Sequence, residues 1–367
     1  AAGDGVAVVG AYRDAEHGTD AGAAYVYEGA AWDETAKLVP ADVGAGDRVG
    51  DSVAVSGDTI VVGSPRDDDM GTDAGAAYVF VHDGVSWVEE AKLLATDGSG
   101  YQHLGHEVAV SGDTALVSAG SSAYVFMRSG DAWVQQQKLT SPSGVYDYFG
   151  SSVAIDGDTA IVGAYGWDSI YDEGRAYVFT RSAGVWSHQA TLAASDGLAD
   201  DMFGFSVDVS GDTAIVGAWG DDDNGSSSGS AYVFDRSGDA WSESAKLQAA
   251  GGNDWDYFGY FVSIDGATSV VGAHGDDEAA PDAGAAYVFA DDGGWSQEAK
   301  LLGSDLAEGD LSGNASIHGE TVLVGAIGDD DAGADAGAAY VFEKSAWAPP
   351  GKGGTPPGQS KKAASAS

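Results

Sequence analysis

The sequence predicts an all-β protein, a seven-bladed β-propeller made of four-stranded antiparallel blades. Three observations support this: the motif Ala-Tyr-Val-Phe, or a close variant, occurs seven times, a tryptophan follows each copy, and 56 glycines interrupt the 367 residues. A repeat of about 50 residues that contains several short strands is typical of propeller blades. The motif tyrosines lie 46 to 55 residues apart, at Tyr25, Tyr78, Tyr124, Tyr177, Tyr232, Tyr287 and Tyr340.

The tryptophans that follow the motif are expected to pack between neighbouring blades, because large rings fill the wide gaps between packed sheets. They are Trp32, Trp87, Trp133, Trp186, Trp241, Trp295 and Trp347.

Each repeat divides into four strand segments. In the repeat at 198–252 these segments read FSVDVS, TAIVGA, SAYVF and WSESAKL. Short β-rich segments separated by Gly- and Asp-containing turns predict a meander of four strands. Between the first two segments, Ser-Gly-Asp-Thr places glycine and aspartate at the centre of the turn, which favours a two-residue type II′ hairpin. Asp212 is therefore predicted to be a turn residue.

The repeats predict a single propeller domain over residues 1–347, followed by a Pro/Gly/Ser-rich tail at 348–367. A linear solenoid, the alternative, would need polar capping repeats, which neither end shows. The first repeat starts at its second strand, so its innermost strand is expected to be absent or reduced to residues 1–2. Prolines at 349, 350, 356 and 357 argue against a regular strand in the tail, which is predicted to be a flexible linker. The incomplete blade leaves open closure by residues upstream or self-assembly with another chain. The approximate repeats are 1–43, 44–98, 99–144, 145–197, 198–252, 253–305 and 306–347.

The charge excludes several classes of partner. The chain carries 58 acidic against 16 basic residues, a formal net charge of −42. Such a surface repels nucleic acid and anionic membranes, and its self-repulsion requires salt or bound cations. Disulfides are excluded because there is no cysteine. Direct membrane insertion is not expected, since no apolar run approaches about 18 residues.

Three stretches carry a family resemblance: YFGSSVAIDGDTAIVGA at 148–164, MFGFSVDVSGDTAIVGA at 202–218 and YFGYFVSIDGATSVVGA at 257–273. They resemble FG-GAP repeats, the units of the seven-bladed propeller of integrin α-subunits and of many secreted bacterial and archaeal proteins. The resemblance implies an extracellular or surface-displayed propeller, often calcium-binding and often adhesive. Integrin-type repeats place their calcium loop between the first and second strands, where this chain has only the short hairpin. The chain is closer to the microbial short-hairpin variant, which has acid between the second and third strands.

Acidic loops between the second and third strands are the candidate metal sites. Five of them share the pattern D-x-[DE]-x-G-x-D, although two copies depart from it at one position each. Oxygen ligands at alternate positions with a glycine for the turn are what a calcium loop requires, whereas Mg²⁺ fits this pattern less well. The alternative is solvated acid on the surface of a halophilic protein. The candidate Ca²⁺ ligands are Asp14, Glu16, Asp20, Asp67, Asp69, Asp73, Asp221, Asp223, Ser227, Asp276, Glu278, Asp282, Asp329, Asp331 and Asp335.

A second acidic position lies three residues before the glycine of the Phe-Gly motif. It could supply a further ligand to a neighbouring loop, or simply close a turn through its side chain, which the sequence favours. The residues are Asp47, Asp147, Asp201, Asp256 and Asp310.

Aromatic residues outside the repeat consensus gather in the loops of repeats 4 to 6. Loop aromatics beside carboxylates form platforms for sugar rings or for a protein partner. We therefore expect a ligand patch on the loop face of blades 4 to 6, for a protein or glycan ligand. Its candidate residues are Tyr146, Tyr148, Tyr165, Trp167, Tyr171, Trp219, Trp255 and Tyr257.

No convergent catalytic set is visible, because no nucleophile, base or phosphate loop recurs in register. The sequence favours a non-enzymatic, extracellular or cell-surface module that binds Ca²⁺ and serves adhesion or ligand binding. Two alternatives stay open: a structural subunit of a surface appendage or coat, and a polysaccharide-active enzyme.

Overall fold

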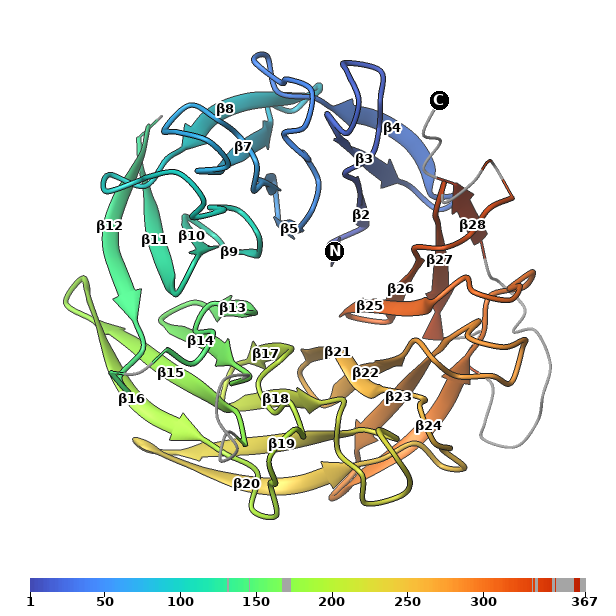
Figure 1. Ribbon diagram of the computed structural model, residues 1–367. Coiled ribbons are helices and arrows are strands. Elements are labelled where there is room, and N and C mark those ends of the chain that lie inside the picture. The colour runs from blue at the N-terminus through green and yellow to red at the C-terminus, as the bar shows by residue number, and fades with distance from the viewer. Residues whose placement is uncertain are drawn as a thin grey trace. The chain divides into compact units, whose positions relative to one another are not determined.

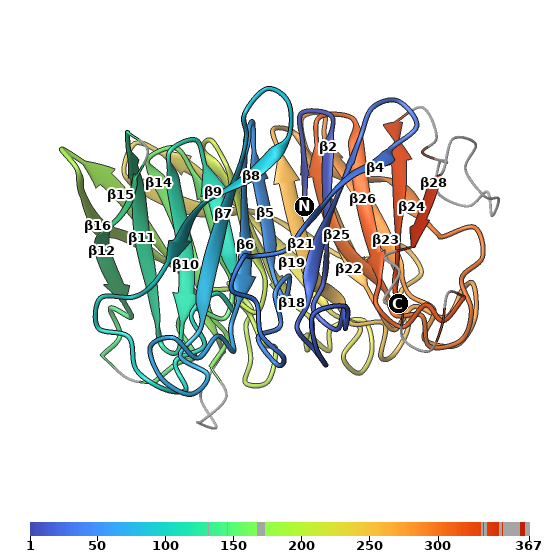
Figure 2. The same ribbon diagram turned by 90° about the horizontal axis from the view of Figure 1, so that it is seen from above.

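The computed structural model describes residues 1–130, 132–144, 146–166, 173–331, 333, 336–344 and 347, and the backbone of Ser360–Ala363. Over these residues the chain is an all-β, seven-bladed β-propeller of four-stranded antiparallel sheets, which confirms the predicted fold (Figures 1 and 2). No helix within this part of the chain could cross a membrane. The chain divides into two compact units: unit 1, with Ala1–Val162 and Thr180–Ser187 as its described parts, and unit 2, with Gly163–Phe179 and His188–Ala363.

Blades 1 to 3 belong to unit 1. Their strands are β1 (Ala2–Gly3), β2 (Val6–Ala11), β3 (Ala23–Glu28), β4 (Asp33–Leu38), β5 (Val53–Ser56), β6 (Thr59–Ser64), β7 (Ala76–His82), β8 (Trp87–Leu93), β9 (Val108–Ser111), β10 (Thr114–Ala119), β11 (Ser122–Ser129) and β12 (Ala132–Thr140). Blade 4 contributes residues to both units. It comprises β13 (Val153–Asp156), β14 (Thr159–Ala164), β15 (Arg175–Ser182) and β16 (Val185–Leu192).

Blades 5 to 7 belong to unit 2, in yellow to red in Figure 1. Their strands are β17 (Val207–Ser210), β18 (Thr213–Ala218), β19 (Ser230–Ser237), β20 (Ala240–Leu247), β21 (Phe258–Asp265), β22 (Thr268–Ala273), β23 (Ala285–Asp291), β24 (Trp295–Leu301), β25 (Ser312–His318), β26 (Thr321–Ala326), β27 (Ala338–Glu343) and β28 (Ser360–Ala363).

Each blade is a meander, and the first turn of blades 2 to 7 is the predicted hairpin. In blade 1 the positive φ lies at the second central residue, Gly5. In blade 5, Ser210 pairs with Thr213, and Gly211 has φ of 59°. A positive φ at the first central residue is what a type II′ turn requires, and glycine adopts it without steric cost. The interpretation of Asp212 as a turn residue is confirmed.

The core lies between successive blades. In unit 2, Ile215 and Leu247 of blade 5 share one buried cluster with Phe258 and Tyr287 of blade 6. The Phe258 ring packs edge-on against that of Tyr287, with ring centroids 5.5 Å apart. The phenylalanine of the Phe-Gly motif therefore joins one blade to the one before it.

Glycine in the Gly-Ala motif at the end of the second strand permits this close approach. A Cβ atom on Gly217 would lie 2.0 Å from the carbonyl oxygen of Gly259, the glycine of the next Phe-Gly motif. The two glycine motifs are thus complementary halves of one blade-to-blade contact.

The repeat tryptophans bridge blades, as predicted. The Trp133 Nε1–H donates to Glu90 of the preceding blade at 2.8 Å, and the Trp241 Nε1–H donates to Gln189 at 2.9 Å. These two indoles therefore donate to the outer strand of the preceding blade, whereas the buried Trp347 Nε1 has no hydrogen-bond partner among the described residues.

A short strand lies at each end of the part of the chain that the structure describes. The innermost strand of blade 1 is reduced to β1, Ala2–Gly3, close to the expectation. The tail differs from the prediction: Ser360–Ala363 forms β28, which pairs antiparallel with β27. The prolines at 349, 350, 356 and 357 lie outside these four residues, whose backbone N–H groups are all present for pairing.

Candidate functional site: the acidic loops and an aromatic cluster

The first aspartate of each acidic loop is buried. The residue is 1 to 3% exposed in all five loops. In blade 5, one carboxylate oxygen of Asp221 accepts the backbone N–H of Asp223 at 3.1 Å, and the other accepts the hydroxyl of Tyr232 at 2.9 Å. The same pair of bonds recurs at Asp14, Asp67, Asp276 and Asp329. The motif tyrosine and the loop aspartate therefore form one repeated unit.

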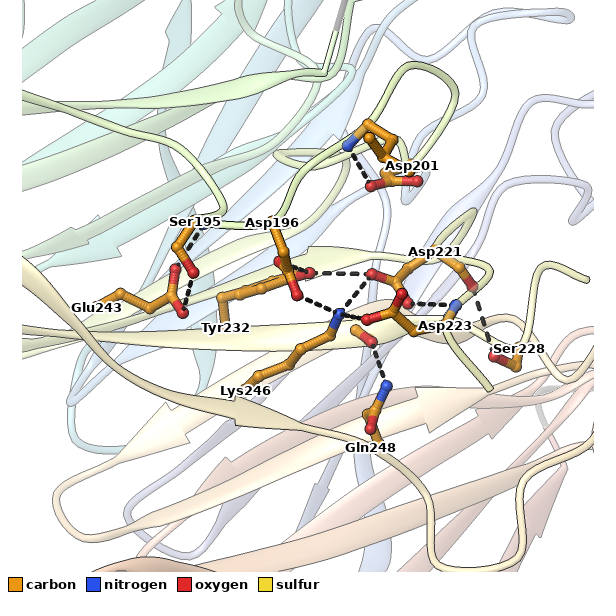
Figure 3. A network of polar contacts seen from close by, with 12 residues as sticks. Ser195, Asp196, Asp201, Asp221, Asp223, Ser228, Tyr232, Glu243, Lys246 and Gln248 are labelled. Atoms are coloured by element: carbon orange, nitrogen blue, oxygen red, sulfur yellow. Dashed lines mark hydrogen bonds and ion pairs between the residues drawn. The ribbon is translucent and has the colours of Figure 1, made fainter. Parts of the chain in front are cut away.

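A lysine from the fourth strand completes this unit. In blade 5 the Lys246 ammonium lies 2.9 Å from Asp221 and 2.6 Å from Asp223 (Figure 3). The Tyr232–Lys246 register places the ammonium over the Tyr232 ring, 5.2 Å from its centroid. Equivalent ion pairs join Lys37 to Asp14 and Glu16, Lys92 to Asp67 and Asp69, and Lys300 to Asp276 and Glu278.

A third carboxylate comes from the connection with the preceding blade. Asp196 accepts from the Tyr232 hydroxyl and from the Lys246 ammonium, both at 2.8 Å (Figure 3). Sequence reasoning missed this position, although an aspartate shortly after the fourth strand also recurs at Asp42, Asp97 and Asp305. We call this set of tyrosine, lysine and carboxylates the Asp–Tyr–Lys network.

The protonation states of the network are strongly biased. Burial works to lower the pKa of Lys246, but its hydrogen bonds to the three carboxylates outweigh this and raise it. Burial works to raise the pKa of Asp196, but the bonds from Lys246 and Tyr232 outweigh this and lower it. Burial and the bond to Asp14 raise the pKa of Tyr25 to about 12. The network thus holds a charged lysine among carboxylates, beside a neutral tyrosine hydroxyl.

The predicted ligands at the seventh position take part in the hydrogen bonding of the loop itself. The backbone N–H of Ser227 donates at 2.5 Å to Asp222, a second-position residue that was not among the predicted ligands. The seventh position has a positive φ of 45° to 52° at Asp20, Asp73, Ser227 and Asp282. Short polar residues tolerate this left-handed conformation best, which accounts for the repeated register there. Asp335 lies outside the described residues.

In blades 1, 2, 5 and 6 these donor sets already hold a cation, the lysine ammonium. Among the residues that the structure describes, no group of three or more His, Cys, Asp or Glu side chains is placed to hold a metal ion. A Ca²⁺ ion at the first and third loop positions would have to displace the ammonium, because both compete for the same oxygens. Calcium at these loops therefore stays a prediction.

The second acidic position closes its own loop. Asp201 accepts the N–H of Leu198, three residues earlier, at 2.6 Å, and Asp256 accepts that of Asn253 at 2.8 Å. Asp47 and Asp310 make the same bond. Burial raises the pKa of Asp201 and of Asp256 to about 6. The role is that of a loop-closing side chain, although the bond runs backwards along the chain and not forwards as in an Asx-turn.

Aromatic side chains of blades 4 to 6 form a continuous cluster in unit 2. Phe205, Trp219 and Tyr260 contact one another, with ring centroids 4.6 to 6.0 Å apart. Tyr257 stacks on His274, with centroids 4.9 Å apart and an interplanar angle of 8°. We call the following set the aromatic cluster: Tyr165, Phe205, Trp219, Trp255, Tyr257, Tyr260, Phe261 and His274.

The cluster is partly open to solvent and carries polar atoms without partners. Trp255 is 55% exposed, and the other rings are half-buried. The buried Trp219 Nε1 and His274 Nδ1 have no hydrogen-bond partner among the residues that the structure describes. Burial lowers the pKa of His274, so the ring is neutral at pH 7. An unpaired buried polar atom is costly, so these two atoms are the unusual chemical feature of the cluster.

The predicted ligand patch is brought together in part. Tyr165, Trp219, Trp255 and Tyr257 lie in the aromatic cluster. Tyr146 and Tyr148 form a separate pair in unit 1, with centroids 4.8 Å apart. Trp167 and Tyr171 lie outside the described residues. Sequence reasoning missed Phe205, Tyr260, Phe261 and His274, which follow the Phe-Gly and Gly-Ala motifs and look like ordinary repeat residues.

Comparisons with known proteins agree on the fold. A family model described as FG-GAP repeat matches residues 32–80, 87–132, 133–179, 186–234, 241–289 and 295–342. No curated protein matches the chain. A solved structure from Bacteroides fragilis, described as a candidate 6-phosphogluconolactonase, is similar at a TM-score of 0.56 and 14% identity, over 92% of this chain and 90% of that one. Hsv2 of Kluyvelomyces marxianus gives a TM-score of 0.46 and 10% identity, over 81% and 72% of the two chains. At 14% identity, the similarity to the Bacteroides fragilis structure shows a shared fold alone. The TM-score of the Hsv2 structure is too low to support an argument.

Proposed function

The chain belongs to the FG-GAP repeat family, and on that premise we propose that it is a non-enzymatic ligand-binding module whose ligand docks on the aromatic cluster. The observation that carries the proposal is the combination, in one place, of an exposed Trp255 with the unpartnered Trp219 Nε1 and His274 Nδ1. A ligand that stacks on the rings and supplies polar atoms would satisfy both features.

The net charge of the chain limits the chemical class of the ligand. A net charge of −42 disfavours anionic partners. Neutral glycans fit better, because sugar rings stack on aromatic faces and their hydroxyls exchange hydrogen bonds with nearby polar groups. A protein segment with an aromatic or hydroxyl-bearing anchor is the alternative ligand of the same site.

The test replaces the exposed ring of the aromatic cluster. Trp255→Ala should weaken retention on soluble neutral polysaccharides or on captured protein ligands, while the melting temperature changes little. Tyr101→Ala is the matched control: Tyr101 occupies the same repeat position in blade 3, is 70% exposed, and shares the positive φ (63° against 70°). Equal binding by wild type and Trp255→Ala would refute the proposed site.

Calcium binding, adhesion and an extracellular or cell-surface location extend this proposal. Two features support these three properties: the acidic loops, and the resemblance to propellers that are often adhesive and calcium-binding. Calcium, if bound there, would stabilise the folded chain against a chelator even in molar NaCl, since a specific ion acts by mass action and not by screening.

Two other functions remain alternatives. A polysaccharide-active enzyme would release product from the same panel, whereas a binding module gives retention alone. A structural subunit of a surface appendage or coat would assemble at micromolar concentration, which light scattering detects.

A further inference from the structure

The fourth strand of blade 7 comes from an unusual place in the chain. In blade 5 the third strand ends at Ser237 and the fourth begins at Ala240. In blade 7 the third strand, β27, ends at Glu343, and its partner β28 begins only at Ser360. The segment that would normally pair follows Trp347, and there Pro349 and Pro350 remove backbone N–H groups that a strand needs.

The distant strand nevertheless reproduces the register of the other blades. Tyr340 of β27 pairs with Lys361, just as Tyr232 pairs with Lys246. The same tyrosine–lysine pairing occurs at Tyr25–Lys37, Tyr78–Lys92, Tyr124–Lys138 and Tyr287–Lys300. A lysine therefore lies at this register in six blades, including the one whose outer strand comes from elsewhere in the chain, whereas blade 4 has Thr191 before its leucine.

Blade 7 also keeps the carboxylates that receive this lysine elsewhere. The Tyr340 hydroxyl donates to Asp305 at 2.8 Å and to Asp329 at 3.2 Å. These two residues correspond to Asp196 and Asp221, which hold Lys246 in blade 5. The outer edge of β27, which β28 occupies in this structure, thus lies beside two carboxylates that correspond to the ammonium-binding carboxylates of blade 5.

One position of β28 departs from every other blade. The corresponding register position of the outer strand is a leucine in the six other blades, after a lysine in five of them and after Thr191 in blade 4. This leucine is only 1 to 3% exposed at Leu38, Leu93, Leu139, Leu192, Leu247 and Leu301. In β28 that register position, opposite Ala339, is Lys362. Lysine is almost never fully buried, so β28 lacks the apolar anchor that fixes an outer strand in the other blades.

We propose that the outer edge of β27 is a strand-acceptor site for an extended segment of a partner protein that carries lysine followed by leucine. The segment adds a strand to β27, its lysine binds Asp305 and Asp329, and its leucine fills the position where β28 has Lys362. Strand addition of this kind draws affinity from the backbone and specificity from alternate side chains. The segment Ser360–Ala363 acts as a weak internal competitor. This inference does not depend on the aromatic cluster.

The experiment measures exchange on the full-length protein. The probe is a fluorescently labelled peptide with the sequence Ser-Glu-Ser-Ala-Lys-Leu, a copy of residues 242–247, and fluorescence anisotropy reports its binding. Lys361→Ala weakens the internal strand and should tighten peptide binding about tenfold. Lys362→Leu supplies the missing anchor to the internal strand and should weaken peptide binding by about the same factor.

The two variants are matched because each removes one positive charge, so an effect of net charge would shift both in the same direction. Replacing lysine by alanine in the peptide should abolish binding to the Lys361→Ala protein. The proposal is overturned if the peptide does not bind the Lys361→Ala protein, or if both variants shift its affinity equally. Concentration-dependent dimers of the wild type that Lys362→Leu abolishes would also overturn it, because they would assign the edge to a second copy of the chain.

Discussion

Blades 3 and 5 contain the same strands but differ in one loop. In blade 5, residues 219–229 separate β18 from β19 and carry the acidic pattern, whereas in blade 3 only residues 120–121 separate β10 from β11. Blade 3 still joins Tyr124, Lys138 and Asp97: the Tyr124 hydroxyl lies 2.9 Å and the Lys138 ammonium 2.7 Å from Asp97. Blade 5 has this same trio at Tyr232, Lys246 and Asp196, and adds Asp221 and Asp223.

The difference shows that the lysine is placed by the sheet and not by the acidic loop. The register of the third and fourth strands sets the ammonium over the tyrosine ring in both blades. The loop carboxylates pair with an ammonium group whose position the sheet fixes. The repeated acidic residues of these loops therefore have a structural explanation: they neutralise a partly buried ammonium group.

The largest expected effect comes from removing the buried carboxylate that blade 5 has and blade 3 lacks. Asp221→Ala leaves Tyr232, Lys246 and the N–H of Asp223 each short of a partner, and should cost about 2–4 kcal/mol in the free energy of unfolding. Asp97→Ala in blade 3 removes a half-exposed carboxylate and should cost less than about 1 kcal/mol. Urea unfolding followed by tryptophan fluorescence measures both. Similar costs would mean that the loop contributes nothing beyond the trio.

Calcium provides the second contrast. If Ca²⁺ competes with the ammonium for the loop oxygens, Lys246→Met should raise calcium affinity about tenfold or more, by removing the competing charge. Lys138→Met should change nothing, because blade 3 has no acidic loop. Isothermal titration in molar NaCl, where non-specific binding is screened, measures the affinities. Failure of Lys246→Met to bind calcium would exclude this loop as a calcium site.

The smallest contrast is a dependence on pH. Burial raises the folded-state pKa of Asp201 from 3.8 to about 6, so the folded state binds more protons than the unfolded state between these values. Stability should therefore fall as pH rises from about 4 to about 6, and stay lower above that range. Asp201→Asn should be close to wild type at pH 4 and melt a few degrees higher than wild type at pH 7.

Blade 3 supplies the control for this pH effect. Gln102 takes the position of Asp201 there, and its Oε1 accepts the N–H of Ser99 at 3.2 Å. Because a neutral amide makes the bond, Gln102→Asn should shift the melting temperature equally at pH 4 and pH 7. A pH-independent effect of Asp201→Asn would show that Asp201 titrates near its ordinary pKa.

Sequence reasoning succeeded for features that depend only on residues within one repeat. The Tyr232 motif, the Gly211–Asp212 turn and the bridging role of Trp241 depend on strand period and turn geometry, which are local properties. Seven copies of a local pattern then left one economical arrangement, a propeller.

Tertiary structure decided what each polar residue does. The partners of Asp221 are Tyr232 and Lys246, which are 11 and 25 residues away and converge only after three strands pair. Loop-to-loop contacts such as Tyr165 with Phe205 join separate blades, so no pattern within one repeat indicates them.

The sequence by itself thus determined the strands, the turns, the blade count and the acidity, because these follow from periodicity and composition. Only the folded chain decided that Lys246 is the cation of the acidic loop, that Trp219 and His274 keep unpartnered polar atoms, and that Lys361 stands opposite Tyr340. The physical reason is the same in all three cases: a side chain's role depends on neighbours that pairing between distant strands brings within a few ångströms.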